Sequence, residues 1–339
     1  MSSNIRNRSL VSVVFLLAGA AVASAQPPIG TRASGMAGAF VGVADDASAV
    51  YWNPAGIATG TIMSAVVMFG QDEIIPDFPQ MTPAQRHRAW MAGFSLPPVG
   101  LAYYQVAAFG SGPVEPAGTE ASDREEVRRS VKALTTSVIG VSLLHSLSQH
   151  VVVGVTPKWM RGSAAVGVSS SLDVRDALDA AADLDGHSTS TFDVDAGVML
   201  AVSHIRLGVV ARNLTTPEFD LDPATGEVVE LDTEVRIGGA WGPSWPGVSR
   251  LVVSVDGDVT SRPTPSGDRR DIAAGVETWW FGQRLGLRAG ARRSTIGDGR
   301  AAFAAGVSAA VKSGTFVEAH VMEGRDDQRG WSIGMRFGF

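Results

Sequence analysis

The chain has 339 residues and a formal net charge of -6 at pH 7; 45% of its residues are apolar, 18% are charged, and none is cysteine. The negative charge argues against a nucleic-acid partner, and the lack of thiols suits an oxidising compartment. The length allows either two or three soluble domains or one large barrel.

The N-terminus has the three parts of a secretory signal peptide. Arg6 and Arg8 form a positively charged start, residues 10–22 are apolar, and Ala23-Ser24-Ala25 supplies a cleavage site of small residues. The apolar stretch is shorter than the roughly 20 residues that a membrane-spanning helix needs. We therefore expect residues 1–25 to be a signal peptide that is removed on export.

Residues 26–60 are rich in small side chains, which suits a segment folded into a confined space. Asp45 and Asp46 are expected to cap a short helix over residues 47–52, and Pro54 ends that helix. Two interpretations remain open: a periplasmic arm, or a hatch that plugs a barrel. The residues that carry the pattern are Gly35, Gly38, Asp45, Asp46, Asn53, Pro54 and Ala55.

From residue 61 to residue 339 the chain repeats an alternation of apolar and small or polar side chains. The pattern is plainest at the end, where Trp331, Ile333 and Met335 alternate with small residues and with Arg336 up to the terminal Phe339. Such alternation is typical of strands in outer-membrane barrels. About fourteen segments of this kind predict an all-β fold, a transmembrane antiparallel β-barrel of about 14 strands. Phe339 is then expected to be a C-terminal assembly signal that the outer-membrane assembly machinery reads.

The connections between these segments alternate in length. Short turns such as Pro97-Pro98 and residues 281–283 occupy every second junction, and long polar connections cover residues 110–129, 162–188 and 215–232. This asymmetry predicts a barrel in which both termini of the chain lie on the periplasmic side. Residues 172–184 have helical spacing and predict a short amphipathic surface helix, with a lid as the alternative.

The segment that begins at residue 32 also carries a resemblance. Gly35-Met36-Ala37-Gly38, Ala44-Asp45-Asp46-Ala47 and Asn53-Pro54-Ala55-Gly56 resemble the N-terminal hatch of the FadL/TodX superfamily of outer-membrane transporters. The resemblance implies a fourteen-stranded barrel plugged by a hatch, and passage of hydrophobic compounds. Residues 193–197, 206–214 and 256–258 resemble a branch related to PorV/PorQ proteins and TraF-like conjugation proteins.

Many charged side chains fall on the inward face of the expected strands, where ionisable groups must meet a polar lumen or one another. They either lock the barrel wall to the hatch or line a polar path. Asp271 and His320 fall on the same face. The candidate lumen charges are Asp193, Asp195, Arg206, Arg212, Arg236, Asp256, Asp258, Glu277, Arg288, Arg292, Glu318 and Arg336.

No catalytic motif, metal-ligand spacing or cofactor-binding loop stands out, so we expect neither an enzyme nor a cofactor. The sequence favours an outer-membrane channel for small hydrophobic compounds. The alternative is a PorV/PorQ-like secretion-accessory or structural protein that binds exported cargo or a translocon. The expected partners are the lipid bilayer, the assembly machinery, and a hydrophobic small molecule or a secretion-system protein.

Overall fold

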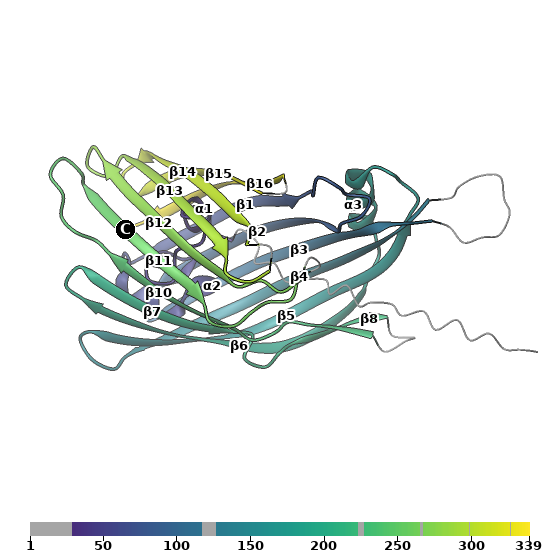
Figure 1. Ribbon diagram of the computed structural model, residues 1–339. Coiled ribbons are helices and arrows are strands. Elements are labelled where there is room, and N and C mark those ends of the chain that lie inside the picture. Colours follow the sequence, from purple (N-terminus) through teal and green to yellow (C-terminus); the bar gives the residue numbers. More distant parts are fainter. Residues whose placement is uncertain (1–28, 117–126, 223–226, 265–266, 298, 326) are drawn as a thin grey trace, which may run out of the picture.

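The computed structural model describes residues 29–116, 127–222, 227–264, 267–297, 299–325 and 327–339. Fourteen antiparallel strands form a closed barrel in chain order, and β1 pairs with β16 to close it (Figure 1). The predicted all-β barrel of about 14 strands is confirmed, whereas the predicted signal peptide lies outside the described residues. The barrel strands are β1 (Ser64–Ile74), β2 (Ala84–Leu96), β3 (Val99–Pro116), β4 (Val127–Ser146), β5 (Val151–Ser169), β6 (His187–Val202), β7 (Ile205–Arg212), β10 (Glu234–Trp241), β11 (Arg250–Asp258), β12 (Asp271–Trp280), β13 (Leu285–Ser294), β14 (Ala301–Lys312), β15 (Thr315–Gly324) and β16 (Gln328–Gly338).

The connections predicted as long polar loops contain more regular structure than expected. Strands β3 and β5 run on to Pro116 and Ser169, because backbone pairing continues where side chains no longer alternate between lipid and lumen. The connection over residues 215–232 contains a two-stranded hairpin, β8 (Glu218–Asp222) and β9 (Glu227–Glu230). The sequence pattern missed this hairpin because its strands are short.

The predicted surface helix is present as α3 (Val174–Ala182). The Asp173 carboxylate accepts a hydrogen bond from the backbone N–H of Arg175 at 2.7 Å and so caps the helix. The apolar face of α3 packs on Phe109, Val131 and other outward-facing residues of β2 to β4. The helix therefore lies against the outside of the barrel wall, at the end with the long connections, and is not a lid over the lumen.

The outer face of the barrel carries a band of exposed apolar side chains. On β16, Trp331, Ile333 and Met335 are 41%, 56% and 42% exposed, whereas Arg336 points into the lumen and donates to Glu318 at 3.1 Å. A contiguous band of exposed apolar side chains around a barrel is a surface that contacts lipid. Within the described residues, no helix has the length and apolar character needed to cross a membrane.

The N-terminal segment, residues 29–60, lies inside the barrel (Figure 1). It consists of α1 (Thr31–Gly35), α2 (Ala49–Trp52) and the 3-10 helix η1 (Pro54–Thr59), and nearly every residue up to Ile57 is buried. The expected capping of α2 by Asp45 and Asp46 is wrong, because α2 begins after Ser48 without a side-chain cap. Asp46 instead accepts the backbone N–H of Ser48 at 2.9 Å, and Asp45 is drawn into ion pairs with arginines.

Candidate functional site in the barrel lumen

Glycines in the barrel wall let the N-terminal segment lie directly against the strands. A Cβ atom on Gly197 of β6 would lie 2.2 Å from Oδ1 of Asn53, and one on Gly290 of β13 would lie 2.3 Å from the carbonyl carbon of Met36. Neither distance is sterically possible, so these positions require glycine. The segment is therefore closely fitted to the wall. The same close approach occurs at Gly100, Gly154, Gly208, Gly275 and Gly334.

Gly35 and Gly38, the glycines predicted from the sequence, allow the N-terminal segment to pack closely against the wall. Gly35 lies against Gly306 of β14, where an added Cβ would be 3.2 Å from the Gly306 Cα. Gly38 has a φ of 86°, a left-handed conformation that disfavours any side chain.

Asn53 connects the segment both to itself and to the wall. Its Nδ2 donates to the carbonyls of Val41 at 3.3 Å and of Val198 on β6 at 3.2 Å, and its Oδ1 accepts the backbone N–H of Ala55 at 3.2 Å. Asn53 is completely buried, so each of these bonds satisfies a polar group that water does not reach. Pro54 then begins η1, where its missing N–H costs nothing.

A chain of buried ion pairs runs from the segment into the wall. Arg32 donates twice to Glu277, at 2.6 and 2.7 Å, and Glu277 also accepts from Arg288 at 2.8 Å. Arg288 reaches Glu318 at 3.4 Å, and Glu318 accepts from Arg336 at 3.1 Å. Four of the predicted lumen charges are thus joined in one network. Arg32 is not among the residues predicted from the sequence, although Glu277, an acidic candidate on the inward face, required a cationic partner.

A second cluster surrounds Asp45. Its carboxylate pairs with Arg32, with Arg250 at 2.5 Å and with Arg206 at 3.2 Å. Burial alone would raise the pKa of Asp45, but the guanidiniums of Arg32, Arg250 and Arg206 hold that pKa well below its usual range. Asp45 is therefore ionised and ties the segment to β7 and β11.

A third attachment uses the backbone of the segment. The carboxylate of Asp256 on β11 accepts the N–H groups of Phe40 and Val41, both at 2.7 Å. Arg236 on β10 donates to the Gly38 carbonyl at 3.1 Å and to Asp258 at 2.8 Å. These bonds supply partners for backbone groups that the segment's tight turns leave free.

The remaining predicted charges form their ion pairs with residues of the barrel wall. Lys158, which the sequence pattern did not single out, lies between Asp193 and Asp195 at 2.8 and 2.7 Å. The alternation of side chains along β5 places Lys158 on the inward face, and this pattern could have identified it from the sequence. Arg212 pairs with Glu234 at 2.9 Å, and its guanidinium lies over the ring of Tyr51 at 4.5 Å.

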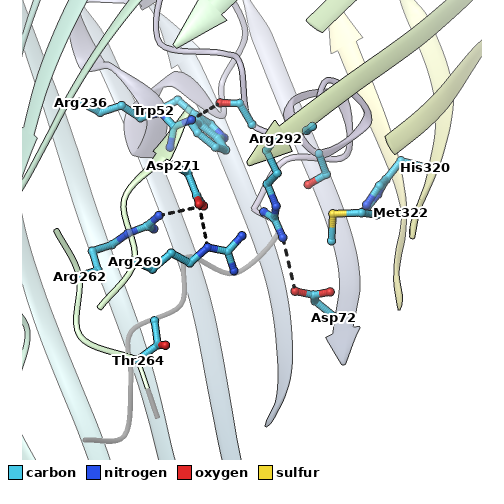
Figure 2. A pocket seen from close by; sticks show the side chains of 13 residues that line it. Trp52, Asp72, Arg236, Arg262, Thr264, Arg269, Asp271, Arg292, His320 and Met322 are labelled. Atoms are coloured by element: carbon cyan, nitrogen blue, oxygen red, sulfur yellow. Dashed lines mark hydrogen bonds and ion pairs between the residues drawn. The ribbon is translucent and has the colours of Figure 1, made fainter. Parts of the chain in front are cut away.

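On the side of the segment toward the long connections, six charged side chains are among the thirteen residues that line a cavity of about 40 Å³ (Figure 2). Asp271 pairs with Arg269 at 2.8 Å and with Arg262 at 3.3 Å. Arg292 approaches Asp72 at 3.9 Å. A cavity this small has room for a few waters only, so this part of the lumen is filled by ion pairs.

Toward β3, β4 and β5 the lumen contains an apolar cluster. Tyr51 of α2 packs edge-on against Tyr104 of β3, with ring centroids 5.6 Å apart. The β8–β9 hairpin places the fully buried Phe219 over Gly162 of β5, on the inward face of that strand. The hairpin therefore folds over an apolar cluster that lies between it and the N-terminal segment. The members of this cluster include Tyr51, Trp52, Tyr104, Leu134, Val138, Met160, Phe219, Val229 and Leu231.

The described part of the chain holds no group of three or more His, Cys, Asp or Glu residues placed to bind a metal ion. The lumen thus contains buried ion-pair networks and an apolar cluster.

Comparison with known proteins identifies the architecture. A family model described as the F plasmid transfer operon TraF protein matches residues 92–258, from β2 to β11. A search of curated proteins found no match. Among solved structures, the chain is similar to the CymD monoaromatic hydrocarbon channel, with a TM-score of 0.61 and 12% identity over 91% of this chain and 97% of that one. The chain has a FadL-type barrel fold.

Two further structures agree with this assignment. A Pseudomonas aeruginosa FadL homologue has a TM-score of 0.54 at 13% identity, covering 91% of this chain and 98% of that chain. The Pseudomonas putida toluene transporter TodX has a TM-score of 0.52 at 12% identity, covering 86% and 93%. The resemblance to the FadL/TodX superfamily is therefore supported at the level of the fold. The family model that matches is TraF, not PorV or PorQ, so the PorV/PorQ part of the resemblance lacks support.

Proposed function

We propose that this FadL-type barrel resides in the outer membrane and lets small hydrophobic compounds pass. The observation that carries the proposal is the apolar cluster between the N-terminal segment and the β8–β9 hairpin, because movement of either element would open an apolar surface of the kind that lines small-molecule sites. The exposed apolar band supports the membrane location. Cargo of this class is consistent with the fold similarity to CymD, a monoaromatic hydrocarbon channel, and to TodX, a toluene transporter.

In this proposal residues 26–60 act as a hatch that closes the lumen. Passage then requires part of the hatch to move, and we expect the movement where no ion pair attaches the hatch to the wall. The Asn53-Pro54 turn is that point, because hydrogen bonds from neutral groups hold it, whereas Arg32 and Asp45 are held by buried ion pairs. The hairpin acts as the outer cover, through Phe219.

Uptake of a small aromatic fluorescent probe tests this proposal. The double variant Asn53→Ala/Pro54→Ala leaves buried backbone carbonyls without donors, at a cost of about 1–3 kcal/mol each. That cost is sufficient to change a closed-to-open ratio roughly tenfold or more, so we expect faster uptake. Phe219→Ala should also raise uptake by uncovering the apolar cluster, whereas the matched control Leu172→Ala alters a side chain that is 60% exposed and should not.

The proposal fails if both variants form correctly folded barrels, judged by heat-modifiable mobility, and take up the probe at the wild-type rate. The alternative, a secretion-accessory or structural role, would then be favoured. Two observations support that alternative: the ion pairs that hold the N-terminal segment, and the match of residues 92–258 to a conjugation-operon family.

A further inference from the structure

A wide cavity opens at the end of the barrel with the short turns. Its volume is about 1110 Å³, and it lies under the N-terminal segment at Asp45, Asp46 and residues 59–61. Its walls come from the turns that join β6 to β7, β10 to β11, β12 to β13 and β14 to β15. In outer-membrane barrels the short turns face the periplasm, so we call this cavity the periplasmic vestibule.

The periplasmic vestibule is strongly cationic. Six basic side chains line it, against only two carboxylates, Asp45 and Asp46. Behind this lining, Glu277 and Glu318 add two carboxylates and Arg288 adds one guanidinium. These groups carry seven positive and four negative charges, and the terminal carboxylate of Phe339, next to the lining residue Gly338, is a fifth negative charge, which leaves an excess of two positive charges. The six lining residues are Arg32, Arg206, Arg250, Arg284, Lys312 and Arg336.

The turns around the periplasmic vestibule add no negative charge to it. The six short connections, residues 97–98, 147–150, 203–204, 242–249, 281–284 and 313–314, contain neither aspartate nor glutamate. Acidic residues are instead frequent in the long connections at the other end, for example at Asp173, Asp176 and Asp179. The two ends of the barrel therefore differ in charge, and an acidic partner is attracted to the end with the short turns.

Several of these cations keep donors available. Arg206 and Arg250 have side chains that are 17% and 34% exposed, and both share the single carboxylate of Asp45. Within the part of the chain that the structure describes, the exposed Arg284 and Lys312 have no carboxylate partner. An arginine fork binds a carboxylate through two parallel hydrogen bonds. The free edges of these groups thus suit carboxylates that enter from the periplasm.

We propose that the periplasmic vestibule binds an acidic segment of a periplasmic protein. A single small anion fits the observations less well, because the cavity exceeds the roughly 300–1,000 Å³ of typical small-ligand pockets. Its cations are also spread from Arg32 on the floor to the rim, where Arg284 lies on the turn before β13 and Lys312 ends β14. A chain of several carboxylates is able to contact floor and rim together.

Binding of a rhodamine-labelled hexaglutamate peptide to the full mature barrel in detergent tests the proposal by fluorescence anisotropy. We expect binding at low salt that weakens as salt rises, and no binding of hexaglutamine or hexalysine. The variant Arg284→Ala/Lys312→Ala should weaken binding by about two- to thirtyfold, since exposed ion pairs are individually modest. The matched control is Arg293→Ala/Arg329→Ala, which removes two exposed arginines at the opposite end.

Three results would overturn the proposal. The first is that the control variant loses as much affinity for hexaglutamate as the rim variant. The second is that hexaglutamine binds as tightly as hexaglutamate. The third is that free glutamate or inorganic phosphate displaces the peptide at the same total concentration of negative charge, which identifies a site for small anions. None of these results depends on the uptake of hydrophobic probes, so the test is independent of the proposed channel activity.

Discussion

Arg32 on α1 and Glu277 on β12, 245 positions apart in the chain, form a two-point ion pair inside the barrel. Nε lies 2.6 Å from Oε2 and Nη2 lies 2.7 Å from Oε1. Both side chains are almost entirely buried, with 4% and 0% of their surface exposed. The pair joins the N-terminal segment to the wall at a position where an unpaired charge has no access to bulk water.

Removing one member of this pair should destabilise the folded barrel strongly. Arg32→Met leaves Glu277 and Asp45 short of a partner, and breaking a buried pair costs about 3–5 kcal/mol. We expect a lower unfolding temperature in detergent, and the exposed pair residue Arg329 supplies the control variant Arg329→Met. Adding Glu277→Gln to Arg32→Met should cost less than the sum of the two single changes. Strict additivity would show that the pair does not couple segment and wall.

The glycine fit makes a second prediction. Gly197→Ala places a Cβ 2.2 Å from Oδ1 of Asn53, so the segment must shift or the strand must bend, at a cost of about 1–3 kcal/mol. Gly257→Ala is the matched control, because no atom lies within 4 Å of its added Cβ. Limited proteolysis should cut the N-terminal segment faster in the first variant only. Equal cleavage in both variants would contradict the fit.

The ionisation of Asp45 predicts an acid-sensitive attachment. Its folded pKa lies below the unfolded value of about 4, so its stabilising effect is complete above that value and is lost as the pH falls toward the folded pKa. Thermal unfolding between pH 7 and pH 3 should show this loss in the wild-type protein. Asp45→Asn should be less stable at pH 7 and should show a shallower decline on acidification. Parallel pH profiles for the two proteins would rule out this role of Asp45.

The C-terminal residue closes the seam of the barrel. Phe339 donates from its backbone N–H to the Met63 carbonyl at 2.9 Å, and its own carbonyl accepts from Met63 at 3.0 Å. Deleting Phe339 should slow insertion into membranes, because it removes both the terminal aromatic and the last bonds of the seam. The measurement is the rate at which heat-modifiable barrel appears on a gel, with Phe337→Leu as a control that keeps the chain length. Unchanged insertion would count against a C-terminal assembly signal.

The sequence by itself determined the barrel. Period-2 alternation places Trp331, Ile333 and Met335 on one face and Arg336 on the other, and a strand admits no other arrangement of consecutive side chains. The alternation of short and long connections followed from the same pattern. These features are local, so one chain without structural information was sufficient to predict them. The short β8–β9 hairpin was missed because its strands of five and four residues give too little periodicity.

Only the tertiary structure decided which residues meet inside the lumen. The alternation placed Glu277 and Arg288 on the inward face, but nothing in it paired Glu277 with Arg32 or Asp45 with Arg250, which lie 245 and 205 positions away. Closure of the barrel brings strands distant in sequence around the N-terminal segment, and burial forces each charge to find a partner there. The wall glycines, the apolar cluster under Phe219 and the cationic vestibule likewise exist only once fourteen strands have closed around that segment.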